Sequence, residues 1–336
     1  MSITIKEVAE KAGVSQSTVS LVLNNKKSVR ESTREKVLQV IKEMDFHPRR
    51  SARTLASRKT GNIGFVISDA HFTRAEPFYT RIFLGCEFEA RKFDYYILLT
   101  SVENTFSRRN MPRFLKEGNV DGVIAAGSMN DHWLYEMKKM GIPVVLIDYY
   151  PPKQKWPCVL IDNADGAREA VHYLQKLGHT QIAFIGGSAY HPSIQERFRG
   201  YMLAMGENGL KHPEWIVRDE EETRVEDGYH ATQKILSRNT LPTAIFAAND
   251  AMALGALKAI REKGLKVPDD ISIVGFDNIE VTNHTLPPLT TMSVRMEEMG
   301  AKAVTMVRDI IDGKKSLQEK ILVPVDLVER KSCRRI

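Results

Sequence analysis

Apolar residues recur at helical spacing over the first fifty positions of this 336-residue chain. The spacing predicts three short helices with a tight turn between the first two, which is a helix-turn-helix unit. Thr4 and Ser15 are the expected N-caps of the first two helices, Gly13 ends the first, and Ser32 or Thr33 begins the third. The apolar stripes consist of Ile5, Val8, Ala9 and Ala12, then Val19, Val22 and Leu23, then Val37, Val40, Ile41 and Met44.

From residue 61 onward, short apolar runs alternate with helical stretches, a pattern that predicts parallel sheets covered by helices on both faces. Strands are expected at 63–67, 95–100, 122–125, 144–147, 159–161, 182–185, 243–247 and 271–274. Helices are expected near 79–92, 107–117, 131–140, 165–177, 194–208, 226–237, 250–263 and 296–312. The strands are too many for one small sheet, and they fall into two similar halves followed by a tail with one helix and one strand.

Composition narrows the class of protein. The hydrophobic content of 43% is ordinary for a globular protein, and no apolar run of about 18 residues predicts a membrane span. The three cysteines are widely spaced, which fits reduced thiols. The chain has no CxxC and no helical pair of histidines, so we expect no metal and no cofactor. The first residues do not resemble a secretory signal, which favours a cytoplasmic protein.

Positive charge is concentrated at the N-terminal end. Residues 1–60 carry thirteen Lys and Arg against six Asp and Glu, whereas the whole chain has a net charge of only +6. A solvated charged face would be the plain explanation of such a stretch, but basic charge on a helix-turn-helix unit favours binding to DNA. Pro48 ends this region, and 49–59 then holds five cations and a single bulky apolar residue, Leu55. A segment this short is marginal as an isolated helix.

The order of residues in the first 55 positions resembles the lactose-repressor (LacI/GalR) family of bacterial transcriptional regulators. The matching string runs from Thr4-Ile-Lys-Glu-Val-Ala through Ala12-Gly-Val-Ser15 to Asn24, and continues to Leu55. The resemblance covers nearly the whole chain. It implies a DNA-binding domain at 1–47, a hinge at 48–60 and an effector-binding and dimerisation domain at 61–336. The last would form two doubly wound lobes like periplasmic sugar-binding proteins, lobe 1 about 61–161 plus 290–320 and lobe 2 about 162–289 plus 321–336.

The resemblance also implies which residues meet DNA. The second helix would enter the major groove and present base contacts from Gln16, Ser17 and Leu21. Leu21 departs from the polar or cationic residue frequent there, and we expect it to meet a thymine methyl group. Backbone contacts are expected from Thr4, Ser15, Thr18, Ser20, Asn24 and Lys27. In the minor groove, the hinge would place Ala52, Arg53 and Leu55, with Leu55 as a wedge between base steps.

Polar residues directly follow several of the predicted strands, where ligands of doubly wound sheets bind. Any one of them is more often a helix cap or a turn residue. Arg197 matches an effector-contacting arginine of the family. The expected effector site consists of Asp69, Phe72, Phe78, Tyr79, Asp148, Asp162, Arg197, Asn249 and Asp277. This mixture suits a neutral polyhydroxylated ligand, a sugar derivative or a nucleoside. The stretch near Thr223 departs from family members that stack an aromatic residue there, which disfavours a purine.

We therefore expect a transcriptional regulator, most simply a repressor, that binds a palindromic operator as a homodimer under allosteric control by a small carbohydrate. A sugar-binding receptor without a DNA role would explain the large body but not the basic head. An enzyme on a doubly wound fold would need a nucleophile–base pair or a cofactor loop, and the sequence offers neither. The sequence leaves open whether the effector releases the operator or promotes its binding.

Overall fold

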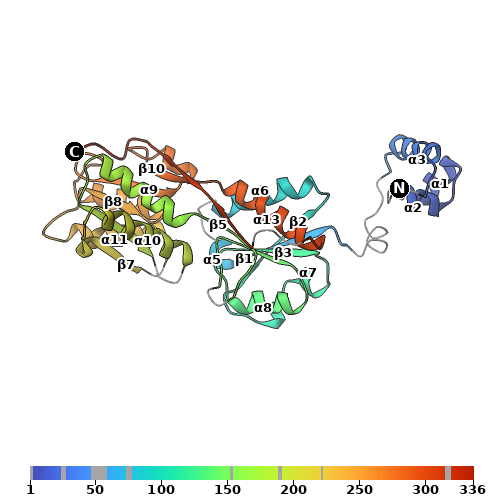
Figure 1. Cartoon of the computed structure of the whole chain (residues 1–336), viewed down its shortest axis with the longest axis horizontal. Coiled ribbons are helices and arrows are strands. Elements are labelled where there is room, and N and C mark those ends of the chain that lie inside the picture. Colours follow the sequence, from blue (N-terminus) through green and yellow to red (C-terminus); the bar gives the residue numbers. More distant parts are fainter. Residues whose placement is uncertain are drawn as a thin grey trace. The chain divides into compact units, whose positions relative to one another are not determined.

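The chain consists of two compact units, Met1–Gly61 and Asn62–Ile336, each described here by itself. The computed structural model describes residues 3–23, 28–46, 59–72, 78–151, 154–187, 191–220, 222–314 and 319–336, drawn as ribbons in Figure 1. The expected DNA contacts Asn24 and Lys27 lie outside these residues. So do the hinge residues Ala52, Arg53 and Leu55, and the side chain of Phe72.

The first unit is the predicted helix-turn-helix bundle. Its helices are α1 (Ile5–Ala12), α2 (Gln16–Leu23) and α3 (Glu31–Glu43). The Thr4 side chain accepts a hydrogen bond from the amide of Glu7 in a reciprocal capping box, and Gly13 ends α1 with φ of 65°. The third helix begins before Ser32, because the amides of Thr33 and Arg34 already donate to the carbonyl of Arg30. The core contains Val8, Ala9, Ala12, Val19, Val22, Val37, Val40 and Phe46.

The second unit contains two sheets, as the sequence predicted, and each sheet has six strands. The first sheet has the order β11-β5-β4-β3-β1-β2 and the second has the order β12-β10-β9-β8-β6-β7. All pairs are parallel except β10 with β12. The strands are β1 (Asn62–Ser68), β2 (Tyr96–Val102), β3 (Gly122–Ala126), β4 (Val144–Ile147), β5 (Cys158–Ile161), β6 (Ile182–Gly187), β7 (Ile216–Glu220), β8 (Ala244–Ala247), β9 (Ser272–Asp277), β10 (Thr290–Val294), β11 (Lys320–Val323) and β12 (Val325–Val328).

Helices cover both faces of the first sheet. The α-helices of this unit are α5 (Asp69–Phe72), α6 (Phe78–Arg91), α7 (Arg113–Lys116), α8 (Asp131–Lys139), α9 (Asn163–Lys176), α10 (Pro192–Glu207), α11 (Val225–Leu236), α12 (Asp250–Glu262) and α13 (Met296–Ile311). Figure 1 shows α6 and α13 on one side of this sheet and α7 and α8 on the other. Successive strand residues accordingly enter different cores: Ile124 packs in one apolar cluster and Val123 in another.

Two strands of the tail lie in the opposite sheet from the one expected. We expected 290–320 in lobe 1 and 321–336 in lobe 2, but β10 pairs with β9 in the second sheet and β11 pairs with β5 in the first. Only α13 returns to the first sheet between them, where it packs against α6. The chain therefore passes between the sheets after β5, β10 and β11. The pattern of apolar residues predicts where a strand lies along the chain but not which strand it pairs with. The expected lobe boundaries were wrong for this reason.

None of the described helices is both long and apolar enough to span a membrane. The single helix expected at 107–117 is instead a 3-10 turn at Arg108–Asn110 followed by α7. Two further 3-10 turns, Pro213–Trp215 and Glu280–Asn283, precede β7 and β10.

Candidate functional site

The helix-turn-helix unit presents one exposed polar face of α2. Gln16 and Ser17 are exposed, whereas Val19 and Val22 of the same helix are buried in the core. Leu21 is 39% exposed. The second helix therefore carries its expected base-reading residues on the side away from the core.

Two of the residues expected at the DNA backbone, Thr4 and Ser15, lie at the starts of α1 and α2. Ser15 caps α2 by accepting a hydrogen bond from the amide of Thr18 at 3.1 Å, and its Oγ lies 2.7 Å from that of Ser17. The amide of Thr4 donates to Glu7 at 2.7 Å, and this bond lowers the pKa of Glu7. Ser20 lies half-buried on α2. These hydroxyl groups support the helix ends, and Ser15 and Thr4 remain exposed.

A second candidate site is a cavity of about 290 Å³ in the large unit, between residues at the carboxyl ends of both sheets. Parallel sheets bind ligands at these ends. The cavity is lined by Ser68, Ala70, His71, Phe78, Tyr79, Asn104, Ser128, Asp148, His191, Ser193, Ile194, Arg197, Glu222, Thr223, Asn249, Ala251, Asp277 and Ile279.

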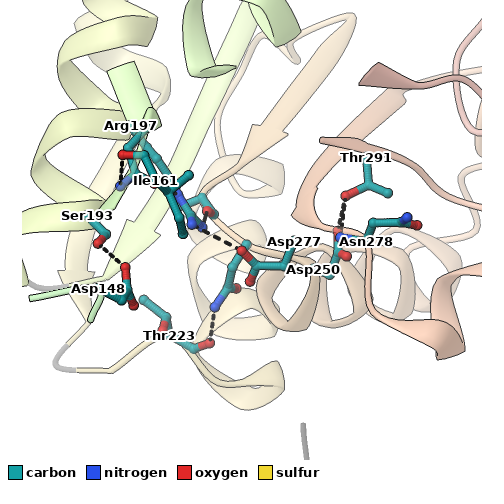
Figure 2. Close-up of polar contacts among 12 residues, drawn as sticks. Asp148, Ile161, Ser193, Arg197, Thr223, Asp250, Asp277, Asn278 and Thr291 are labelled. Carbon is teal, nitrogen blue, oxygen red and sulfur yellow. Dashed lines mark hydrogen bonds and ion pairs between the residues drawn. The ribbon is translucent and has the colours of Figure 1, made fainter. Parts of the chain in front are cut away.

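Asp148 joins the two lobes at this cavity. It follows β4 with φ of 56°, a left-handed conformation that aspartate tolerates better than most residues. One carboxylate oxygen accepts a hydrogen bond from the hydroxyl of Tyr79 on α6 at 3.0 Å. The other accepts one from the hydroxyl of Ser193 on α10 at 2.7 Å, so the bond crosses from the first lobe to the second (Figure 2).

Arg197 on α10 is almost completely buried, and each nitrogen of its guanidinium group has a partner. Nε donates to the side chain of Asn163 and Nη1 donates to the carbonyl of Ala248, both at 2.7 Å. Nη2 lies 3.0 Å from a carboxylate oxygen of Asp277, and the guanidinium group stacks 3.7 Å above the ring of Phe276. These contacts fix the fork in one orientation, which recognition of adjacent hydroxyl groups requires.

Asn249 and Asp277 complete the wall on the second sheet. Asn249 caps α12 by accepting a hydrogen bond from the amide of Met252 at 2.9 Å, and it donates to the carbonyl of Thr223 at 3.0 Å. Behind this wall, burial and the nearby Asp277 raise the pKa of Asp250 to about 8. Asp250 is fully buried and does not line the cavity.

The structure brings most of the expected effector residues together: Phe78, Tyr79, Asp148, Arg197, Asn249 and Asp277 all line the cavity. Two of the expected residues lie outside this lining. Asp162 does not line the cavity, because its side chain caps α9 by accepting a hydrogen bond from the amide of Asp165. Asp69 lies in the first turn of α5, where its neighbours Ser68 and Ala70 reach the cavity instead.

Sequence reasoning missed several polar residues that line the cavity, among them His71, Ser128, His191 and Ser193. His71 Nε2 lies 3.1 Å from the hydroxyl of Ser128, and its ring stands perpendicular to that of His191. Nδ1 of His191 accepts the amide of Ser193 at the start of α10. For His191 and Ser193, the available signal was the start of the helix that follows β6. Among the described residues, no group of three His, Cys, Asp or Glu could hold a metal ion.

Two family models match the chain, one in each of its units. Residues 4–49 match the model of bacterial regulatory proteins of the lacI family, and residues 171–333 match a periplasmic binding protein-like domain. The chain is 36% identical to the HTH-type transcriptional repressor PurR of Pasteurella multocida over 335 residues, which is 98% of each chain.

Two solved structures resemble the whole chain. The lac repressor dimer bound to operator and the anti-inducer ONPF has a TM-score of 0.81 and 29% identity, with 99% of this chain and all of that chain covered. A complex of the transcriptional regulator CelR with cellobiose has a TM-score of 0.73 and 29% identity, with 98% and 99% covered.

Proposed function

Since the chain belongs to the lacI family of bacterial regulatory proteins, and is a DNA-binding transcriptional regulator rather than an enzyme, we propose that it represses its genes under the control of a neutral sugar. The sugar or sugar derivative binds in the cavity between the two sheets. The regulator acts as a homodimer on a palindromic operator in the cytoplasm. The first unit binds the DNA and the second unit binds the sugar.

The charge of the side chains that line the cavity is the observation that supports a neutral ligand. The described lining residues include three carboxylates, Asp148, Asp277 and Glu222, and one guanidinium group, that of Arg197. Arg197 is already paired with Asp277 at 3.0 Å, so it brings little uncompensated positive charge. An anionic effector would leave two carboxylates facing its own charge, which costs binding free energy.

Neutral hydroxyl groups suit the same residues well. Each hydroxyl donates one hydrogen bond and accepts others, and the wall offers carboxylate acceptors beside guanidinium, amide and imidazole donors. The rings of Phe78 and Tyr79 stand at 86° to each other and supply an apolar side for the carbon face of a sugar. The structural neighbour recorded with cellobiose supports a carbohydrate.

For DNA, we propose that α2 enters the major groove with Gln16, Ser17 and Leu21 at the bases. Thr4, Ser15, Thr18 and Ser20, with Asn24 and Lys27, hold the phosphate backbone. In this scheme Ala52, Arg53 and Leu55 of the hinge at 48–60 occupy the minor groove. The exposure of Gln16, Ser17 and Leu21 supports the first part.

A surface that suits a second copy lies on the first lobe. Leu84 and Phe88 on α6, and Leu99 on the same face of β2, are large apolar side chains exposed by 39–55%. The edge strand β2 lies at the end of its sheet. Apolar residues grouped on neighbouring elements mark interaction surfaces, and a two-fold dimer matches a palindromic operator.

The lobes themselves supply the coupling between the two ligands. Asp148 and Ser193 link the lobes across the cavity, so a sugar bound there changes how closely the lobes approach. In the proposed mechanism, this movement shifts the dimer contact of the first lobes and hence the spacing of the two hinges. Linkage requires sugar and operator to change each other's affinity by the same factor.

A thermal-shift screen of the full chain tests the choice of ligand. The panel holds D-glucose, D-galactose, D-ribose, cellobiose, adenosine, hypoxanthine and glucose 6-phosphate. A true effector at a hundred times its dissociation constant stabilises the folded state by about 2.7 kcal/mol. We expect a neutral sugar to raise the melting temperature; a shift with glucose 6-phosphate or hypoxanthine alone would refute the proposal.

Filter binding with genomic DNA fragments tests the DNA role. Retention should be selective and should fall steeply with salt, because phosphate contacts release counterions. Leu55→Ala should weaken operator binding while the thermal shift with sugar is unchanged. Unchanged operator affinity in this variant would refute the wedge at the hinge.

A further inference from the structure

Asp250 lies behind the wall of the cavity and directs one carboxylate oxygen at the segment that follows Asp277 and the other at β10. It opens α12 and is fully buried. Its Oδ2 accepts a hydrogen bond from the amide of Ile279 at 2.9 Å. Its Oδ1 accepts one from the hydroxyl of Thr291 on β10 at 2.6 Å (Figure 2).

The segment that Asp250 holds has a backbone conformation that needs support. Asp277 and Asn278 have φ of 115° and 57°, although neither is a glycine. Such residues persist where surrounding contacts over-determine them. Asp250 binds the amide of Ile279 directly, and Thr291 accepts the amide of Asn278 at 3.3 Å. Two consecutive amides after Asp277 thus depend on one carboxyl group.

A second arm reaches the same turn from the C-terminal region. Nη2 of Arg330 donates to the side-chain oxygen of Asn278 at 2.6 Å, while Nη1 donates to the carbonyl of Leu289 at 2.6 Å. The Asn278 amide group donates to the hydroxyl of Ser293 at 3.0 Å. The turn is therefore clamped from the core by Asp250 and from the tail by Arg330.

Strand β9 is built to admit the carboxyl group. A Cβ atom on Gly275 would lie 2.2 Å from Oδ1 of Asp250, well inside van der Waals contact. Only glycine leaves room for the carboxylate there. The close approach shows that the position of Asp250 is set by backbone on one side and by hydrogen bonds on the other.

We infer that Asp250 is the positioning residue of the cavity: by holding the turn at 277–279, it sets where the Asp277 carboxylate stands opposite Arg197. The distance between that carboxylate and Nη2 of Arg197 is 3.0 Å. The inference rests on the proposed function only in taking this cavity as the effector site. Asp250 touches no ligand and acts through Asp277.

The charged groups around Asp250 make its action observable. Asp277 on β9, Arg197 on α10 and Arg330 after β12 all act on its charge. Burial first, and then Asp277, raises the pKa of Asp250 to about 8, against the hydrogen bonds from Thr291 and Ile279. The carboxyl group therefore gains or loses its proton at mildly alkaline pH, and the hydrogen bonds to the turn change with it.

NMR of the uniformly labelled full chain provides the test. The amide resonances of Asn278 and Ile279 are followed from about pH 6 to about pH 9.5. We expect both to shift together with a midpoint near the pKa of Asp250, and to stay flat in the isosteric variant Asp250→Asn. The amide of Tyr149, which follows the comparable left-handed residue Asp148, serves as the control and should not share this midpoint.

Thr291→Val removes one link and keeps the shape of the side chain. In this variant the amide of Ile279 should still titrate, whereas the amide of Asn278 should lose its response. The inference is overturned if both amides titrate in Asp250→Asn as in the wild type, if neither moves in the wild type, or if Thr291→Val leaves Asn278 unchanged. Should Asp250→Asn fail to fold, Thr291→Val decides. No ligand is needed, so a sugar panel without thermal shifts refutes the proposed effector and leaves this result standing.

Discussion

Replacing Arg197 by methionine tests the central ion pair of the cavity without knowledge of the effector. The side chains of Arg197 and Asp277 are only 4% and 13% exposed. Arg197→Met keeps the packing on the Phe276 ring but leaves the Asp277 carboxylate without its cation. Removing one partner of a buried ion pair costs about 3–5 kcal/mol.

This loss of folding stability predicts a clear drop in the melting temperature. A loss of 1 kcal/mol lowers the melting temperature by about 2–4 °C for chains somewhat smaller than this unit, so we expect a drop on the order of 10 °C. Differential scanning calorimetry of the full chain measures it. Arg199→Met on the same helix is the matched control: that side chain is 68% exposed and, within the described part of the chain, its ion pair is with Glu196, so its loss should be within about 0.5 kcal/mol.

The pH dependence identifies the cause. If the loss in Arg197→Met comes from an uncompensated carboxylate, acid that protonates Asp277 should restore part of the stability. A deficit below about 1 kcal/mol, or one that stays constant as the pH falls, would refute the reasoning, because a mere packing defect does not depend on pH.

Three further predictions follow from single features. The folded protein raises the pKa of Asp250 from 3.8 to about 8, so between these pH values it holds a proton that the unfolded chain has released. The free energy of unfolding should therefore fall as the pH rises through this range. Urea titrations should show this fall in the wild type and a flatter one in Asp250→Asn. In Gly85→Ala the new Cβ atom would lie 2.1 Å from the carbonyl oxygen of Glu297, which should cost about 1–3 kcal/mol or more of folding stability. In Gly206→Ala the new Cβ atom meets nothing within 4 Å, so calorimetry should show a slightly stabilised helix. Leu21→Ala should weaken operator binding several-fold with an unchanged salt slope, since an apolar contact releases no counterions; a changed slope in filter binding would contradict this.

The sequence predicted the strands that are apolar and buried on both faces. It missed β7, and in the tail it predicted a single strand where the structure has β10, β11 and β12. The run Ile216–Glu220 lies at the edge of its sheet and needs few apolar residues. In β10, Thr290 and Thr291 are completely buried but polar, because their hydroxyl groups bond to residues about forty positions away. Pattern along the chain cannot reveal partners at that separation.

The candidate site was predictable as a region but not residue by residue. Asp148 and Asp162 each follow an isoleucine at the end of a strand in the first sheet. The first lies at the cavity with a left-handed backbone, while the second caps the next helix. Residue type is identical in the two cases, and only the path of the chain after the strand separates them. His71 and Ser128 gave no pattern along the chain, since they meet across 57 positions of the sequence.

The threefold passage of the chain between the sheets has a consequence for biosynthesis. The first lobe receives α13 and the edge strand β11 from residues 296–323, long after its strands β1 to β5 have been synthesised. Until then a nascent chain that has finished β5 exposes the apolar face that α13 later covers. The N-terminal bundle has its own core and can fold on the ribosome much earlier. Ribosome-bound chains halted before residue 296 should therefore carry a folded head and a chaperone-dependent body.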